Sequence, residues 1–60
     1  MPMTGPELRK IRHRLELTQE QMAEVIGLHW NTVARMERGE VRISEPVAKL
    51  ARLILATKKR

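Results

Sequence analysis

The sequence contains no cysteine, and this absence excludes two devices that small domains often use for stability. No disulfide can form, and a zinc site built from thiolates is impossible. The two histidines are too few for a structural metal site, so we expect neither a metal nor another cofactor. A chain of 60 residues then depends on apolar packing, on good helix caps, or on a second copy of itself.

Long apolar stretches are absent as well. The longest uninterrupted one, residues 53–56, is far shorter than the ~20 residues that span a bilayer. The N-terminus shows no basic region followed by an apolar segment, which is the pattern of a secretory signal. These features predict a cytoplasmic protein without a membrane partner.

Aromatic residues are nearly missing, because Trp30 is the only one in the chain. The β-branched residues are scattered and do not alternate with polar ones, as they would in strands. Apolar residues recur instead at helical spacing, in short segments separated by caps and turns. We therefore expect an all-α fold in a single domain over residues 1–60.

Basic residues are in excess, with twelve Lys and Arg against seven Asp and Glu and a net charge of +5. This excess favours polyanionic partners, nucleic acid before anionic membrane. An enzyme is not expected, because the chain has no nucleophile–base set, no phosphate-binding loop and no paired carboxylates beside a plausible pocket. So small a chain also offers little volume for a small-molecule ligand, and none is expected.

Two segments begin with the S/T-x-x-E/Q pattern of a capping box, in which two side chains each satisfy a free backbone amide at the start of a helix. Thr4 and Glu7 form the first box, before a helix expected over residues 5–15. Thr18 and Gln21 form the second. Both patterns predict well-defined helix starts.

Glycines mark the ends of the next two helices. Gly27 ends the second helix, two further residues separate it from a third helix that opens at Trp30, and Gly39 ends the third. Glycine suits such ends because it adopts a left-handed backbone at little cost. Two short helices joined by so tight a turn cross at ~90–120°, which predicts a helix-turn-helix over residues 18–39.

A last helix is expected over about residues 44–57, with Ser44 as its cap and a basic tail at residues 58–60. The buried faces of all four helices are predicted from apolar residues at helical spacing. They comprise Leu8, Ile11, Leu15, Met22, Ala23, Ile26, Val33, Met36, Val47, Leu50, Ala51 and Ile54.

Residues 18–28 and 31–39 resemble the phage-repressor-type (Cro-like, xenobiotic-response-element, XRE) helix-turn-helix family. The motif comprises a Gln-Glu pair, a small residue, the turn glycine and a terminal Glu-Arg-Gly, and the similarity extends into the first and last helices. The resemblance implies a four-helix, lambda-repressor-like DNA-binding domain. Members of the family commonly have a fifth helix, which this sequence lacks.

The resemblance also implies a role for each matching position. Arg12 and Glu37 match a pair that joins the first helix to the end of the third. Base contacts in the major groove match Trp30, Asn31 and Arg35. Phosphate contacts match Gln19, Thr32 and Arg38, to which we add the neighbouring Thr18 and His29.

The chemistry of these residue types agrees with those roles. Asn bonds bidentately to adenine and Arg to guanine, each with ~1–3 kcal/mol of discrimination. Two positions admit alternatives. His29 is a poor cap by residue preference, so Asn31 is an alternative cap and would then turn away from the bases. Trp30 is either a core residue or exposed toward DNA, and we favour exposure because Val33 and Met36 already take the inward positions.

These features predict sequence-specific binding of double-stranded DNA in the cytoplasm, at the nucleoid. The leading hypothesis is a transcriptional repressor that acts by occupying its operator. An inverted-repeat operator would call for a homodimer, with recognition helices ~34 Å apart. Two alternatives are an antitoxin-type module with a protein partner, and an adaptor on the same fold that docks RNA or protein.

Overall fold

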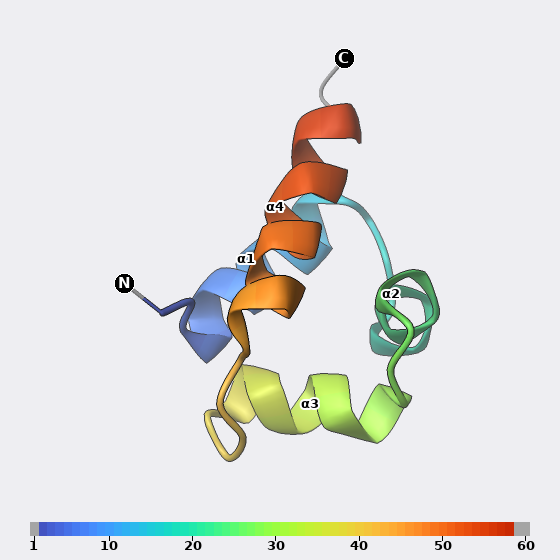
Figure 1. Cartoon of the computed structure of the whole chain (residues 1–60). Coiled ribbons are helices and arrows are strands. Elements are labelled where there is room, and N and C mark those ends of the chain that lie inside the picture. Colours follow the sequence, from blue (N-terminus) through green and yellow to red (C-terminus); the bar gives the residue numbers. More distant parts are fainter. Residues whose placement is uncertain (1, 59–60) are drawn as a thin grey trace.

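A computed structural model describes residues 2–58 of the chain, and it contains four α-helices. Helix α1 spans Gly5–Arg14, α2 spans Gln19–Ile26, α3 spans Trp30–Arg38 and α4 spans Glu45–Lys58. No strand occurs within residues 2–58, so the predicted all-α, four-helix fold is confirmed. Helix α3 lies across the base of the molecule, and α4 rises from it toward the C-terminus (Figure 1).

Both predicted capping boxes are present. The Thr4 hydroxyl accepts from the amide of Glu7 at 3.3 Å, and the Glu7 carboxylate accepts from the amide of Thr4 at 3.3 Å. The corresponding bonds between Thr18 and Gln21 measure 2.9 and 3.1 Å. Because these contacts are local, the sequence pattern alone was sufficient to place the first residues of α1 and α2.

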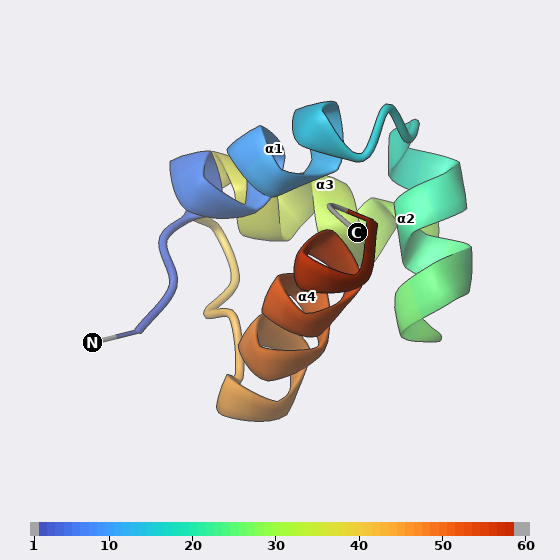
Figure 2. The same ribbon diagram turned by 90° about the horizontal axis from the view of Figure 1, so that it is seen from above.

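The helices surround a core that α1, α3 and α4 share with one face of α2. Helix α3 packs against α1 and α2, and α4 stands beside α1 and packs against α1 and α2, with its first turn near the end of α3 (Figures 1 and 2). Leu8, Met22 and Val33 are the largest side chains with no solvent contact. Met3 and Ile43, which precede α1 and α4, also belong to this core and were not predicted.

The predicted buried face of α4 is confirmed at Ala51, but the observed face is rotated toward Ala48, which was not predicted. Ala48 and Ala51 are completely buried, whereas Val47, Leu50 and Ile54 are only partly buried. Alanines at the contact let the axis of α4 approach its neighbours closely, which turns the larger side chains toward the edge of the core. Part of the apolar surface of α4 therefore remains outside the core.

The ends of α4 also differ from expectation. Ser44 is at the predicted cap position, and its carbonyl oxygen accepts from the amide of Ala48 at 2.9 Å, but no hydrogen bond of residues 2–58 uses its hydroxyl. The helix continues to Lys58, whose ammonium donates to the carbonyl of Leu15 at 3.0 Å. The remainder of the predicted basic tail, 59–60, lies outside the described residues. None of the described helices is long and apolar enough to cross a bilayer.

The backbone of Gly5, at the start of α1, packs directly against the end of α3. A Cβ atom at this position would lie 2.4 Å from the carbonyl oxygen of Glu37 and 2.6 Å from that of Met36. Any larger residue would therefore push the start of α1 away from the end of α3. This contact helps to set how α3 is held across the base of the fold.

Candidate nucleic-acid interface

A tight turn joins α2 to α3. Gly27 ends α2 with a left-handed backbone of φ +85°, and the amides of Gly27 and Leu28 both donate to the carbonyl of Ala23 at 2.8 Å. Gly39 ends α3 in the same way, at φ +81°. Both glycine stops were predicted. Together they limit α3 to a short helix that lies along one edge of the molecule (Figure 1).

The start of α3 is capped by His29. Its Nδ1 atom accepts a hydrogen bond from the amide of Asn31 at 3.1 Å, in the place that a serine or aspartate oxygen takes in an ordinary cap. The helix therefore begins at Trp30, and Asn31 lies within the first turn. The expectation that histidine caps poorly was wrong here because its ring nitrogen is itself a good acceptor.

Trp30 does not enter the core. The residue is 48% exposed, and its ring lies at a tilted angle beside that of His29, with the centroids 5.8 Å apart. Val33, Ala34 and Met36 fill the inward face of α3 instead. A large apolar ring thus stands at an exposed helix start.

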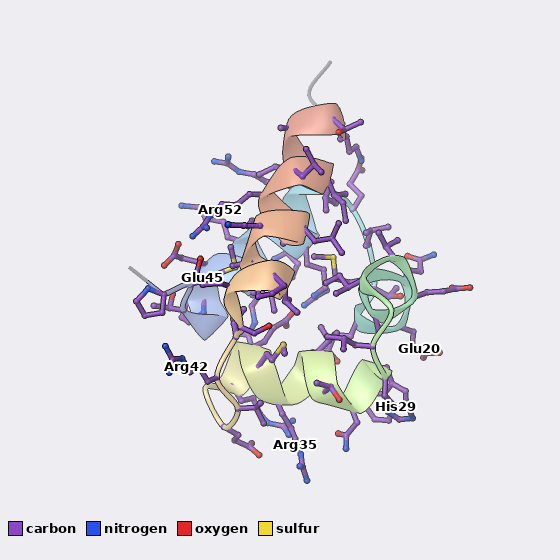
Figure 3. The ribbon with its side chains drawn as sticks, viewed as in Figure 1. Glu20, His29, Arg35, Arg42, Glu45 and Arg52 are labelled. Carbon is purple, nitrogen blue, oxygen red and sulfur yellow. The ribbon has the colours of Figure 1, made fainter. Side chains whose placement is uncertain are left out.

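Two further predicted residues lie along the outer side of α3. Arg35 is exposed and points away from the body of the domain (Figure 3). Thr32, the third residue of α3, is partly buried. The exposed edge of α3 therefore presents a cation at its middle and polar groups at its start.

Arg38 is engaged by an acidic neighbour that the sequence analysis overlooked. Its Nε atom lies 2.5 Å from a carboxylate oxygen of Glu40, and both side chains are 52% exposed. The hydrogen bond and the charge of Arg38 lower the pKa of Glu40, with a smaller contribution from the charge of Arg35. The sequence does contain a signal for this pairing, because Glu40 follows Arg38 by only two residues.

Glu37 has a buried side chain that gathers three helices. Arg12 of α1 forms a two-pronged contact with it, from Nε at 2.6 Å and from Nη2 at 3.1 Å. Gln19, the first residue of α2, donates from Nε2 at 3.2 Å, and Arg9 approaches to 3.5 Å. The contact expected between Arg12 and Glu37 is thus present, with two partners that were not foreseen.

The surroundings of Glu37 act on its pKa in opposite directions. Burial raises the pKa, because a carboxylate loses its hydration, whereas hydrogen bonds from Arg12 and Gln19 and the charge of Arg12 lower it. The net direction is downward. Glu37 is therefore held ionised inside the fold by the groups around it.

Thr18 and Gln19, the predicted phosphate contacts at the start of α2, both already take part in hydrogen bonds within the protein. The amide of Gln19 gives one hydrogen to Glu37, which leaves its second hydrogen available. The hydroxyl of Thr18 accepts the capping bond from Gln21 and keeps its own proton to donate. Both retain a donor, but that of Gln19 is fixed in direction.

Arg42 is an exposed basic residue that no sequence motif identified. It lies in the connector between α3 and α4, beside the end of α3 (Figure 3). The only sequence feature that could have identified it is its position shortly after the helix-turn-helix of residues 18–39. It extends the basic edge beyond Arg35.

Four helices, a glycine turn between two of them and an exposed polar start to the second define a helix-turn-helix protein, a class that acts by binding DNA. A family model described as a helix-turn-helix domain matches residues 5–57. The chain therefore belongs to the helix-turn-helix domain family. No curated protein matches the chain.

Proposed function

We propose that this protein is a sequence-specific double-stranded DNA-binding regulator of the phage-repressor type (Cro-like, XRE). The observation that carries the proposal is the division of α3 into two sides. Val33, Met36 and Glu37 are buried against the fold, whereas Arg35 stands in solvent on the opposite side and Trp30 is exposed at the first residue of the helix. A helix held this firmly, with its other side free, has the form of a recognition helix.

The exposed side separates by chemistry into base-reading and phosphate-binding groups. Asn31 and Arg35 have the donor and acceptor patterns for adenine and guanine, and Trp30 offers apolar area to a thymine methyl. Around them stand donors suited to phosphate oxygens, which set register without reading sequence. These donors are Thr18, Gln19, His29, Thr32 and Arg38.

In this proposal the protein works in the cytoplasm, at the nucleoid, as a repressor. Two copies bind an inverted repeat with their α3 helices ~34 Å apart, in successive major grooves on one face of the duplex. Repression follows from occupancy, because an operator covered by protein is closed to other factors.

Selection of bound sequences from random duplexes tests the proposal directly. We expect an enriched inverted repeat, and binding that weakens steeply with salt as phosphate contacts release counterions. Enrichment of no sequence, or affinity that does not respond to salt, would contradict it.

Two variants separate the proposed roles. Arg35→Ala should relax the preference at one base pair of each half-site, with a loss of about 1–3 kcal/mol on the preferred sequence. Gln19→Ala should weaken binding to all duplexes about equally. Arg14→Ala, an exposed arginine on α1, is the matched control and should alter neither property. Identical behaviour of the first two variants would remove the division into base and phosphate contacts.

A further inference from the structure

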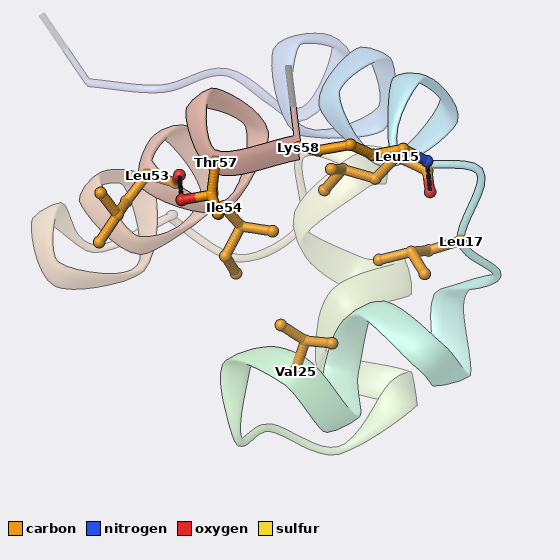
Figure 4. Close-up of a pocket in the computed structure, with 7 residues that line it drawn as sticks. All are labelled: Leu15, Leu17, Val25, Leu53, Ile54, Thr57 and Lys58. Atoms are coloured by element: carbon orange, nitrogen blue, oxygen red, sulfur yellow. Dashed lines mark hydrogen bonds between the residues drawn. The ribbon is translucent and has the colours of Figure 1, made fainter. Parts of the chain in front are cut away.

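An apolar groove lies between α2 and α4, away from α3. It has a volume of about 440 Å³. Its walls come from the end of α1, the segment that follows it, α2 and α4 (Figure 4). The lining residues are Leu15, Leu17, Val25, Leu53, Ile54, Thr57 and Lys58.

Two of the large apolar residues that the fold leaves exposed line the groove. Leu53 is 63% exposed and Val25 is 49% exposed, although both are large aliphatic residues. The Thr57 hydroxyl does not make the groove polar, because it donates to the carbonyl of Leu53 at 2.9 Å. Contiguous apolar surface of this kind on a small domain indicates an interaction site.

The apolar surface continues along α4 as a stripe. Pro46, Leu50, Leu53 and Thr57 recur at alternating steps of four and three residues, the spacing of a helix-pairing seam. This stripe is distinct from the buried face of Ala48 and Ala51. A second helix laid beside α4 would cover it.

The two sides of the apolar surface formed by the groove and the α4 stripe carry opposite charges. On α2, Glu24 stands next to Val25, and the charged residues of this helix are all acidic. On α4, Lys49 stands one turn before Leu53, and Arg52 directly precedes it. Within residues 2–58, none of Glu24, Lys49 and Arg52 takes part in an ion pair.

From these features we infer that the groove and the α4 stripe bind a second copy of the chain. In a two-fold contact each copy presents the same surface, so the acidic α2 side of one copy meets the basic side of α4 in the other, twice. A surface with one sign of charge on each side of an apolar strip is complementary to itself.

The position of α4 suits such a pair to DNA. Helix α4 rises away from α3 (Figure 1), so a two-fold axis running beside α4 leaves both α3 helices at the same end of the dimer. The domain measures 32 × 25 × 18 Å, dimensions of the same order as the ~34 Å between half-sites. This part of the inference rests on the proposed function; the contact between copies does not.

Sedimentation equilibrium without DNA tests the contact. We expect a concentration-dependent dimer that Leu53→Glu weakens by about tenfold or more, because a carboxylate would be buried in an apolar contact. Val41→Glu, which places the same charge on an exposed apolar residue outside the groove, should leave the dimer unchanged. Thermal melting followed by circular dichroism checks that each variant is folded.

Exchange of charges gives a second test that is independent of Leu53. Glu24→Lys and Lys49→Glu should each weaken self-association, because each creates two like-charge contacts in a two-fold pair. An equimolar mixture of the two variants should associate more tightly than either alone, since both contacts are then between opposite charges.

Several results would overturn the inference. A chain that stays monomeric at its highest soluble concentration has no such contact, and stable capture of a different protein at the groove would identify another occupant. A dimer unaffected by Leu53→Glu and by both charge variants has its interface elsewhere. The assay contains no DNA, so a dimer that binds no preferred duplex contradicts only the proposed function, and a monomer that binds one contradicts only this inference.

Discussion

Two glutamates near the end of α3 form the same kind of contact in opposite settings. Glu37 has a side chain without solvent contact and joins Arg12 and Gln19 from two other helices. Glu40 is half exposed and pairs with Arg38, only two residues away in the chain. Both carboxyls have a lowered pKa, so charge alone does not distinguish them.

The two pairs differ in whether their charged groups can be hydrated by water when the pair is broken. A buried carboxylate that loses its partners cannot recover hydration, so the Glu37 network is needed for the fold. An exposed pair such as Arg38 with Glu40 gains little over the hydrated state, and its arginine can change partner at little cost. One contact fixes α3 in place, whereas the other occupies Arg38, which in the proposed function binds a DNA phosphate in place of Glu40.

Removal of the buried carboxylate should have the largest effect. Glu37→Ala leaves Arg12 without its main partner, and we expect a loss of about 3–5 kcal/mol in the free energy of unfolding. In a domain this small that loss lowers the melting temperature by more than about 10 °C. Calorimetry measures it, with Glu40→Ala as the exposed control, which should shift the transition by only a few degrees. Equal shifts would remove the distinction between the two pairs.

The contact of Gly5 with the backbone of Glu37 should be the next most sensitive. Gly5→Ala places a Cβ 2.4 Å from a carbonyl oxygen, and we expect about 1–3 kcal/mol of destabilisation as α1 shifts. Gly27→Ala is the control, because its Cβ would meet nothing within 4 Å and only its left-handed backbone is strained. Urea unfolding compares them. A smaller loss for Gly5→Ala than for Gly27→Ala would show that α1 adjusts freely.

Acid should reveal the buried pair more than the exposed one. The pKa of Glu37 is lowered from its ordinary value of 4.5, so its contribution to stability is complete above that pH and is lost as the pH falls through the folded-state pKa. We expect Glu37→Gln to flatten the acid dependence of the unfolding free energy. Glu40→Gln should leave most of that dependence in place. An unchanged acid slope in Glu37→Gln would place the acid-sensitive group elsewhere.

The exposed pair should show its role in binding. If Glu40 competes with phosphate for Arg38, Glu40→Gln should tighten DNA binding several-fold and steepen the slope of log K against log salt by about 0.9. The melting temperature should barely change. Filter binding over a range of salt concentrations measures both quantities. Weaker binding in this variant would show that Glu40 orients Arg38 instead of withholding it.

Features that depend on neighbouring residues could be predicted from the sequence. The capping boxes at Thr4 and Thr18 and the glycine stops at Gly27 and Gly39 are completed within a few residues. Short stretches of sequence therefore contain the whole pattern, and the predicted helix limits agree closely with the observed ones. The exception, His29, failed because residue preferences average over geometries in which its ring nitrogen does not face the helix.

Features that depend on how helices meet could not be predicted. Apolar residues occupy more than half of the circumference of α4, so the pattern alone could not show that Ala48 would be buried and Leu53 exposed. The capture of Gln19 by Glu37 requires three helices to converge on one carboxylate. Such contacts follow from the approach of backbones, which residue spacing along one helix does not record.

The cap at His29 has a consequence for the ring itself. Because Nδ1 accepts the amide of Asn31, it carries no proton, and the neutral imidazole must hold its proton on Nε2. The cap therefore selects one tautomer and leaves an uncharged N–H at the exposed end of α3. A phosphate bound there would gain a hydrogen bond without neutralisation of its charge, so this contact would strengthen binding at every ionic strength alike and would displace no counterion.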